Sequence, residues 1–209
     1  MKFDGIPSAQ LATETNRLSS DRDLEKALRE GAFDESRFAE AAAFLDQVPG
    51  EFESNSYLDK FFAPNSGVTI QTRFSDGVLT VYYSALDVPT ILAEIKHWVL
   101  KQIAVHKAPR LYYRVVRCQF AGSVIDLVGR DEEFPCLVAD DGYDECNEWA
   151  RDAKAMNIAA FHTQSARLPN GICLPVFARA ALGNATVGER YSFTLDAGAN
   201  SVIAAPVPS

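Results

Sequence analysis

The sequence predicts a single α+β domain, because of its length, its composition and the order of its helical and strand-like segments. With 209 residues, the chain is long enough to bury the core of one large domain. Its 47% apolar and 23% charged residues are typical of a soluble globular protein. Strand-like and helical runs follow one another without regular alternation, which favours an α+β arrangement over a doubly wound sheet.

The N-terminal region, residues 1–60, is predicted to be helical and to precede a main domain at residues 61–200. Between residues 8 and 48, apolar side chains recur at steps of three and four positions among charged ones, which is the spacing of one helix face. These apolar positions are Leu24, Ala27, Leu28, Phe33, Phe38, Ala41, Phe44 and Leu45.

The main domain is predicted to open with a β-hairpin. Asp76 and Gly77 stand between two strand-like runs, and both residue types tolerate the positive φ values that a hairpin turn needs. Arg73 is then expected at the end of one strand and Tyr83 on the next.

A long helix is expected after this hairpin, at about residues 88–105. Asp87 followed by Pro89 and an apolar run is typical of a helix start, since proline near the first helical positions costs no hydrogen bond. Glu94 falls in the second turn of that helix. A cation, an aromatic ring and a carboxylate are thus expected to converge from three elements.

The rest of the chain reads as strands around a second helix, with a loose end. Residues 201–209 are small and contain proline, which predicts a loose C-terminal tail. The expected strands lie near residues 111–120, 123–128, 158–163, 172–177 and 190–195, and the expected helix near residues 143–156.

The net charge and the cysteines of the chain argue against several classes of function. A net charge of −8 argues against a nucleic-acid surface, which needs clustered lysine and arginine, but it allows a small anion held by local arginines. No apolar run approaches the length of a membrane span, and no metal-ligand spacing occurs. Free thiols in a reducing cytoplasm are therefore expected of the four cysteines, Cys118, Cys136, Cys146 and Cys173.

The segment from Thr72 to Glu94 resembles the RES-domain family, toxin components of bacterial toxin–antitoxin pairs named for an arginine, a glutamate and a serine. The resemblance covers about Val68 to Gly198. Its further matches are Asp126-Leu127, the helix from Asn147 to Ile158, the run Phe161-His162-Thr163-Gln164-Ser165-Ala166-Arg167, Gly171, Phe177 and the strand from Tyr191. Arg17-Leu18 is similar to the family's opening motif.

The resemblance implies a fold similar to ADP-ribosyltransferases, with two short antiparallel sheets around a cleft for NAD. It implies attack at the nicotinamide–ribose bond, with NAD as substrate and no metal. Glu94 would stabilise the oxocarbenium-like charge of the ribose, and Arg73 would hold the pyrophosphate in a bidentate way. Tyr83 would stack on nicotinamide or bond to a ribose oxygen, and Ser165 would contact the ribose or the carboxamide. Arg17 and Arg167 are further candidates for binding NAD.

Each of these residues also has a structural interpretation. Arg73 and Glu94 could form a surface ion pair, Tyr83 could be core packing, Ser165 a turn residue, and Arg167 a salt-bridge partner.

Several functional alternatives stay open as well. The acceptor could be phosphate, water or a protein side chain, which distinguishes an NAD phosphorylase, a glycohydrolase and an ADP-ribosyltransferase. A catalytically degenerate binding module of the same fold is a further alternative. The resemblance also implies a cytoplasmic protein with an antitoxin partner of the Xre helix-turn-helix type, and homo-oligomers are compatible with it.

Overall fold

The computed structural model describes residues 3, 5–21, 55–63, 71–106, 110–196, 198 and 201–207. Most of the helical pattern predicted between residues 8 and 48 lies outside these ranges. The elements in chain order are β1 (Ser8–Ser20), α3 (Asn55–Phe62), β2 (Tyr82–Ala85), α4 (Val88–His106), β3 (Arg110–Asp126), the 3-10 helix η2 (Pro135–Leu137), α5 (Asp144–Ala155), β4 (Ala160–Gln164), β5 (Ile172–Val176), the 3-10 helix η3 (Arg179–Ala181), β6 (Leu182–Asp196) and β7 (Ser201–Pro206).

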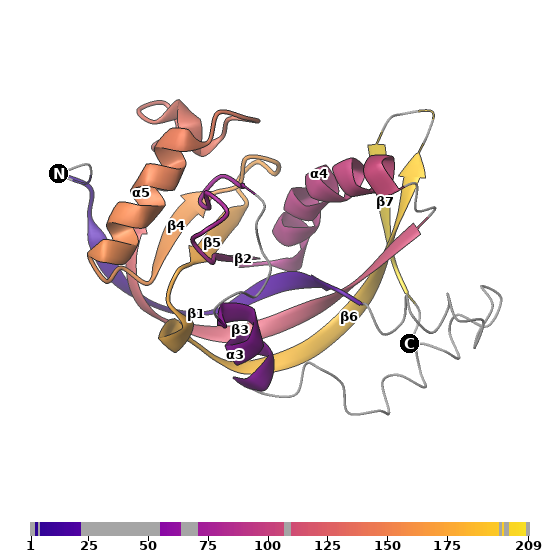
Figure 1. The fold of residues 1–209 in the computed structure, drawn as a ribbon, viewed down its shortest axis with the longest axis horizontal. Coiled ribbons are helices and arrows are strands. Elements are labelled where there is room, and N and C mark those ends of the chain that lie inside the picture. The colour runs from indigo at the N-terminus through magenta and orange to yellow at the C-terminus, as the bar shows by residue number, and fades with distance from the viewer. Residues whose placement is uncertain are drawn as a thin grey trace.

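One strongly curved sheet organises the molecule (Figure 1). Its strand order is β1-β2-β5-β4-β3-β6-β7, and a further pairing of β1 with β3 closes the first five strands of that order into a ring. One edge of β3 pairs with β1, while the other edge pairs with β6 along its first part and with β4, in parallel, at its end. The resemblance implied two short antiparallel sheets, whereas the structure has one continuous sheet with long strands and a parallel pair.

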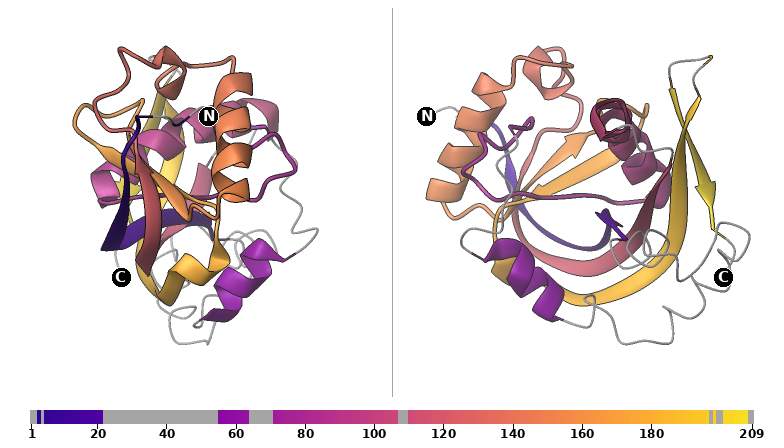
Figure 2. Two further views of the ribbon diagram at one scale, coloured as in Figure 1. Left: turned by 90° about the vertical axis from the view of Figure 1, so that its left-hand side faces the viewer. Right: turned by 45° about the vertical axis from the view of Figure 1, so that its right-hand side comes forward.

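Side chains along β3 point alternately to the two faces of the sheet, and their contacts show which helices cover each face. Tyr113 and Val115 pack in one hydrophobic cluster with α4, and Ile125, on the same face, packs with α5. Val116 and Cys118 point the other way and pack with Leu58 of α3. Figure 2 shows the same arrangement, with α4 inside the curve of the long strands and α3 outside it.

The prediction of helix is wrong for residues 8–20, which form strand β1. Every position of β1 pairs with β3, from Ser8 opposite Ile125 to Ser20 opposite Tyr113. Serine and threonine supply many residues of this segment, and its apolar residues lack a helical repeat. The periodicity that suggested helix comes from residues beyond β1.

The expected break between strands at residues 120 and 123 is absent, because β3 runs through it. Gly122 lies within the strand, and a Cβ atom there would come within 2.7 Å of the Cβ of Ala159. Glycine is needed at this position for close approach of the chain before β4, and it makes no turn.

The C-terminal segment is also ordered where a loose tail was predicted. Residues Ser201–Pro206 pair with β6 from Tyr191 to Asp196. Val202 is buried in the cluster that contains α4. Pro206 is compatible with this strand because β7 lies at an edge of the sheet.

In the described residues, no helix combines the length and the apolar character that crossing a bilayer requires.

Candidate functional site

Glu94 lies in the second turn of α4, as the sequence predicts. The Oδ1 atom of Asp87 accepts the N–H of Thr90 at 2.7 Å and so caps the start of the helix. With Pro89 in the first turn, the start of α4 at Val88 is fixed locally. The helix therefore carries Glu94 to one defined position over the sheet.

One carboxylate oxygen of Glu94 accepts three hydrogen bonds from the protein. Its Oε1 atom accepts from Ser165 Oγ at 2.6 Å, from the N–H of Ala166 at 3.0 Å and from the thiol of Cys173 at 3.7 Å. Across the described part of the chain, the other oxygen, Oε2, has no hydrogen-bond partner. The carboxylate is thus held by one oxygen, and the second oxygen can accept a hydrogen bond from a ligand.

Ser165 is fixed by the connection between β4 and β5. Its hydroxyl donates to Glu94 and accepts the N–H groups of Arg167 and Leu168, both at 3.0 Å. Its own N–H donates to the carbonyl of Gly171 at 2.7 Å. Ser165 is therefore a turn residue that also links this loop to Glu94, and its predicted contact with the ribose or the carboxamide stays a prediction.

Arg73 lies in a tight turn from Thr72 to Ser75, whose backbones exchange hydrogen bonds of 2.8 and 3.3 Å. Asp76 and Gly77 do form a turn, in which Asp76 Oδ1 accepts the N–H of Val78 at 3.0 Å and Gly77 has a φ of 88°, but Arg73 lies in a turn of its own and not at the end of a strand. The Nη2 atom of Arg73 donates to the carbonyl of Ala139 at 2.9 Å, and the guanidinium lies 5.7 Å from the ring centroid of Tyr143. Its Nε atom is buried and has no hydrogen-bond partner among the described residues.

Arg167 forms an ion pair with Asp140. The hydrogen bond from Arg167, followed by its positive charge, lowers the pKa of the Asp140 carboxyl below its ordinary value. Tyr143 donates its hydroxyl to the backbone carbonyl of Asp140 at 2.6 Å. A single loop, residues 139–143, thus contacts both Arg73 and Arg167.

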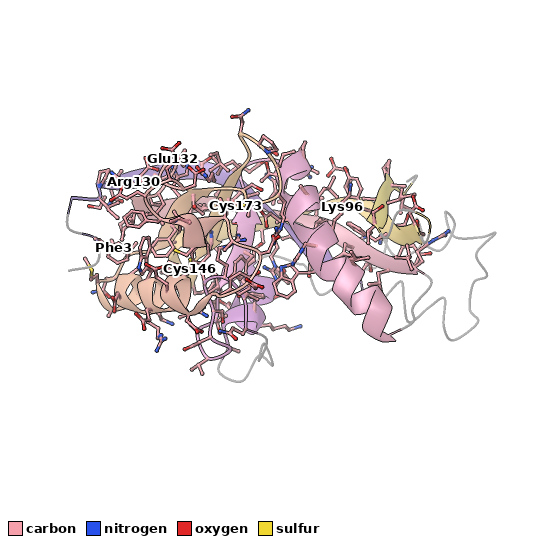
Figure 3. The ribbon with its side chains drawn as sticks, turned by 90° about the horizontal axis from the view of Figure 1, so that it is seen from above. Phe3, Lys96, Arg130, Glu132, Cys146 and Cys173 are labelled. Carbon is pink, nitrogen blue, oxygen red and sulfur yellow. The ribbon has the colours of Figure 1, made fainter. Side chains whose placement is uncertain are left out.

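Arg73 and Glu94 do not form the ion pair that their spacing allowed, since neither has an ion-pair partner among the described residues. Cys173 lies close to both. Burial, and then the negative charge of Glu94, hold the pKa of this thiol well above its usual range, while Arg73 acts in the opposite direction. Cys173 therefore stays protonated and serves as a donor to Glu94. In the view of Figure 3 it lies between α4, which carries Lys96, and α5, which carries Cys146.

Tyr83 lies on β2, as expected, but its hydroxyl is engaged within the protein. The Oη atom lies 2.6 Å from Thr72 Oγ1 and accepts the N–H of Phe74 at 2.7 Å. Its ring stacks on that of Phe74, with centroids 6.5 Å apart. The side chain of Tyr83 therefore contacts the turn that contains Arg73.

Arg17 contacts none of Arg73, Glu94 and Ser165 in the described structure. Its guanidinium lies over the rings of Phe61 and Tyr82, at 4.6 and 5.0 Å, on the face of the sheet that α3 covers. Its Nη1 atom donates to the carbonyl of Tyr83 at 3.0 Å. Packing accounts for Arg17 in this structure, and its predicted role in binding NAD stays a prediction.

Sequence reasoning did not find three residues of this site. Asp140 lies in an acidic stretch before α5, whose first turn holds Asp144 and Glu145, and nothing in that stretch singles it out. No sequence pattern marks Cys173 or Tyr143 as site residues, because their roles depend on contacts with Glu94 and Arg73, which are distant in sequence.

The site contains a negative group, Glu94, and a positive group, Arg73, which do not bind each other. A carboxylate with one free oxygen suits a ligand hydroxyl or a positive charge that develops during reaction. An arginine without an ion-pair partner suits a diphosphate or a carboxylate. The arrangement therefore fits a substrate that carries both an anionic group and a polar, electron-poor reacting centre.

Comparisons with known proteins agree with this fold and identify the family of the chain. The family model of the RES domain matches residues 52–196, which is more than half of the chain and includes Arg73, Glu94 and Ser165. The chain has no match among curated proteins. Its structure is similar to MbcT in the crystal structure of the M. tuberculosis MbcT-MbcA toxin-antitoxin complex, with a TM-score of 0.51 and 12% identity over 92% of this chain and 90% of that one. At this identity the likeness shows a shared fold. The family match shows that the chain belongs to the RES domain family.

Proposed function

We propose that the chain is the toxin of a toxin–antitoxin pair and that it consumes NAD by cleaving the bond between nicotinamide and ribose. Three observations support the proposal. The chain belongs to the RES domain family, it shares a fold with MbcT, a toxin that is complexed with its antitoxin, and its candidate site holds Glu94 with one free carboxylate oxygen. The third observation carries the chemical part of the proposal.

The free oxygen of Glu94 suits a reaction that develops positive charge on a sugar. When the bond between the ribose carbon and nicotinamide breaks, the electron pair moves to the pyridinium nitrogen, and nicotinamide leaves as a neutral molecule without needing a general acid. The ribose carbon becomes electron-poor, and a fixed carboxylate stabilises that state or holds a ribose hydroxyl. The three donors on Oε1 preorganise the Glu94 carboxylate before the substrate arrives.

Arg73 would bind the diphosphate of NAD. The guanidinium has no ion-pair partner among the described residues, and its planar fork matches phosphate oxygens. Arg167 would become a second contact once its ion pair with Asp140 opens. Phosphate, water and a protein side chain can each attack the same ribose carbon, so the acceptor is left open.

The decisive experiment is incubation of the purified protein with NAD, with nicotinamide release followed with and without inorganic phosphate. Release that requires phosphate would identify a phosphorylase, and release in its absence a glycohydrolase. Release only in the presence of a cell extract, with label from NAD appearing on protein, would identify an ADP-ribosyltransferase. A folded protein that binds NAD without releasing nicotinamide under any of these conditions would contradict the proposed activity and favour a degenerate binding module.

We further propose that an antitoxin of the Xre helix-turn-helix type binds this chain and blocks its site in the cytoplasm. The support is that the MbcT neighbour is complexed with an antitoxin. The net charge of −8 adds to it, because opposite charges speed the association of an acidic protein with a basic partner.

A further inference from the structure

Tyr83 and Tyr82 are neighbours on β2, and their side chains point to opposite sides of the strand. Tyr82 is fully buried beside Arg17 and α3, and its hydroxyl lies 3.3 Å from Cys118 Sγ. Tyr83 points toward the cluster that contains Phe74 and α5. The two phenols differ by one position in sequence, yet only Tyr83 contacts the turn of Arg73.

The hydroxyl of Tyr83 holds the backbone on both sides of Arg73. On one side it lies within hydrogen-bond distance of Thr72 Oγ1, at 2.6 Å. On the other side it accepts the N–H of Phe74 at 2.7 Å. Arg73 is the residue between them, so one phenol fixes the direction in which the chain presents its side chain.

The hydrogen bonds by which Tyr83 braces the turn of Arg73 are anchored in the hydrophobic core. Phe74 is buried; its ring stacks on Tyr83 and meets Phe161 of β4 edge-on, with centroids 5.3 Å apart. Burial raises the pKa of the Tyr83 phenol well above its usual range, so the hydroxyl keeps its proton and remains a hydrogen-bonding group at all physiological pH values. Both of its hydrogen bonds go to the turn, and the turn is thereby tied to the sheet.

We infer that Tyr83 is a positioning residue: it sets the guanidinium of Arg73 for the anionic group of the substrate and makes no direct contact with the reacting atoms. The identity of that anionic group as a diphosphate rests on the proposed function. The other part of the inference, that Tyr83 holds the turn of Arg73 in place, rests on the contacts of Tyr83 alone.

The test is the Tyr83→Phe variant, which removes the hydroxyl and keeps the ring. Tyr82→Phe is the matched control, because it makes the same chemical change one position away and leaves the turn untouched. Amide exchange of Phe74, followed by NMR, should be about tenfold faster in Tyr83→Phe, since its N–H loses its acceptor, and unchanged in Tyr82→Phe. Unchanged exchange of Phe74 in Tyr83→Phe would overturn the inference.

Kinetics test the link to Arg73. In Tyr83→Phe the KM for NAD should rise between about tenfold and a hundredfold, with a much smaller change in kcat, because a misplaced binding group weakens substrate capture. In an Arg73→Ala background, Tyr83→Phe should change KM less than about twofold, since the residue it positions is gone. An equal loss in both backgrounds, or a fall in kcat alone, would mean that Tyr83 acts on the substrate directly.

The failure of the proposed function is distinguishable from the failure of this inference. If the wild-type protein released no nicotinamide, the proposed function would fall, while faster Phe74 exchange in Tyr83→Phe would still support the brace. If the wild-type protein turned NAD over and Tyr83→Phe matched it in both exchange and KM, the inference alone would fall.

Discussion

At the scale of single residues, Glu94 and Arg73 are each held in place by hydrogen bonds to the protein before a substrate binds. Glu94 uses one oxygen to bind the loop after β4 and keeps the other available. Arg73 donates from Nη2 to the carbonyl of Ala139 and has no ion-pair partner among the described residues. Each charged group is thus preorganised by hydrogen bonds within the protein, which is the arrangement that lets a protein stabilise charge in a substrate without first reorganising itself.

The first prediction is that Glu94→Gln lowers the rate of nicotinamide release by about 100-fold or more, equivalent to about 2.7–4 kcal/mol. Glutamine keeps an oxygen that can accept from Ser165 and Ala166, so the fold should be retained, while the negative charge is lost. Single-turnover kinetics and a thermal melt would measure both. Glu132→Gln, at an exposed carboxylate, is the control. Near-wild-type turnover by a folded Gln variant would rule out the role of Glu94.

The second prediction concerns the fork of Arg73. Arg73→Lys keeps the positive charge but loses bidentate geometry, so the KM for NAD should rise by about tenfold or more. Arg130→Lys, in an exposed ion pair with Glu133, is the matched control and should leave the KM unchanged. Full activity in Arg73→Lys would show that Arg73 only contributes to structure.

At the scale of elements, the approach of the β4–β5 loop to the start of α4 decides whether Ser165 reaches Glu94. Gly171 lies at this approach. A Cβ atom there would come within 2.7 Å of Thr90 Oγ1, 3.0 Å of Thr90 Cγ2 and 3.1 Å of the carbonyl of Leu168. The contact between loop and helix therefore depends on a glycine, although its backbone conformation does not require one.

The third prediction follows from that contact. Gly171→Ala should displace the loop, lower the free energy of unfolding by about 1–3 kcal/mol and reduce NAD turnover. Adding Thr90→Ala removes both side-chain atoms from the clash and should restore part of the stability and the activity. Gly183→Ala, where a Cβ would meet nothing within 4 Å, is the control. Chemical denaturation would measure the three variants, and wild-type stability in Gly171→Ala would contradict the close approach.

The fourth prediction tests the C-terminal strand. Deleting residues 201–209 would remove β7 and uncover the cluster in which Val202 packs with α4. Burial of Val202 alone is worth about 1.5–3 kcal/mol, so the truncated chain should melt at a clearly lower temperature. The single substitution Ile203→Ser, at an exposed position of the same strand, should have little effect. A truncated chain that melted like the full chain would support the loose tail that the sequence suggested.

At the scale of the whole molecule, the elements with local signals could be predicted and those that depend on distant partners could not. The start of α4 is encoded by Asp87 and Pro89, and the acidic first turn of α5 by Asp144 and Glu145, so both helices lie close to their predicted ranges. Strand β1 lacks such a signal, because its pairing with β3 is what makes it a strand.

The same distinction holds for the site. The order of Arg73, Glu94 and Ser165 along the chain was informative because a family pattern contains it, and the structure brings Ser165 onto Glu94. Other contacts join residues that become neighbours only after folding. They are the ion pair between Arg167 and Asp140 and the hydrogen bonds by which Tyr83 holds the turn of Arg73. Spacing in the sequence carries no information on such contacts.

The last prediction concerns the cell in which the chain works. A protein that consumes NAD would damage its own cytoplasm, so expression of this chain alone should arrest growth and lower cellular NAD. Co-expression of the proposed helix-turn-helix antitoxin should restore both, because the partner would cover the site around Arg73 and Ser165. The Glu94→Gln variant is the control: it should bind the antitoxin, measured by co-purification, and leave growth and NAD unchanged. If the wild-type chain were expressed in folded form, without its partner, and left NAD and growth unaltered, the chain would be a binding module of the family and the toxin assignment would be wrong.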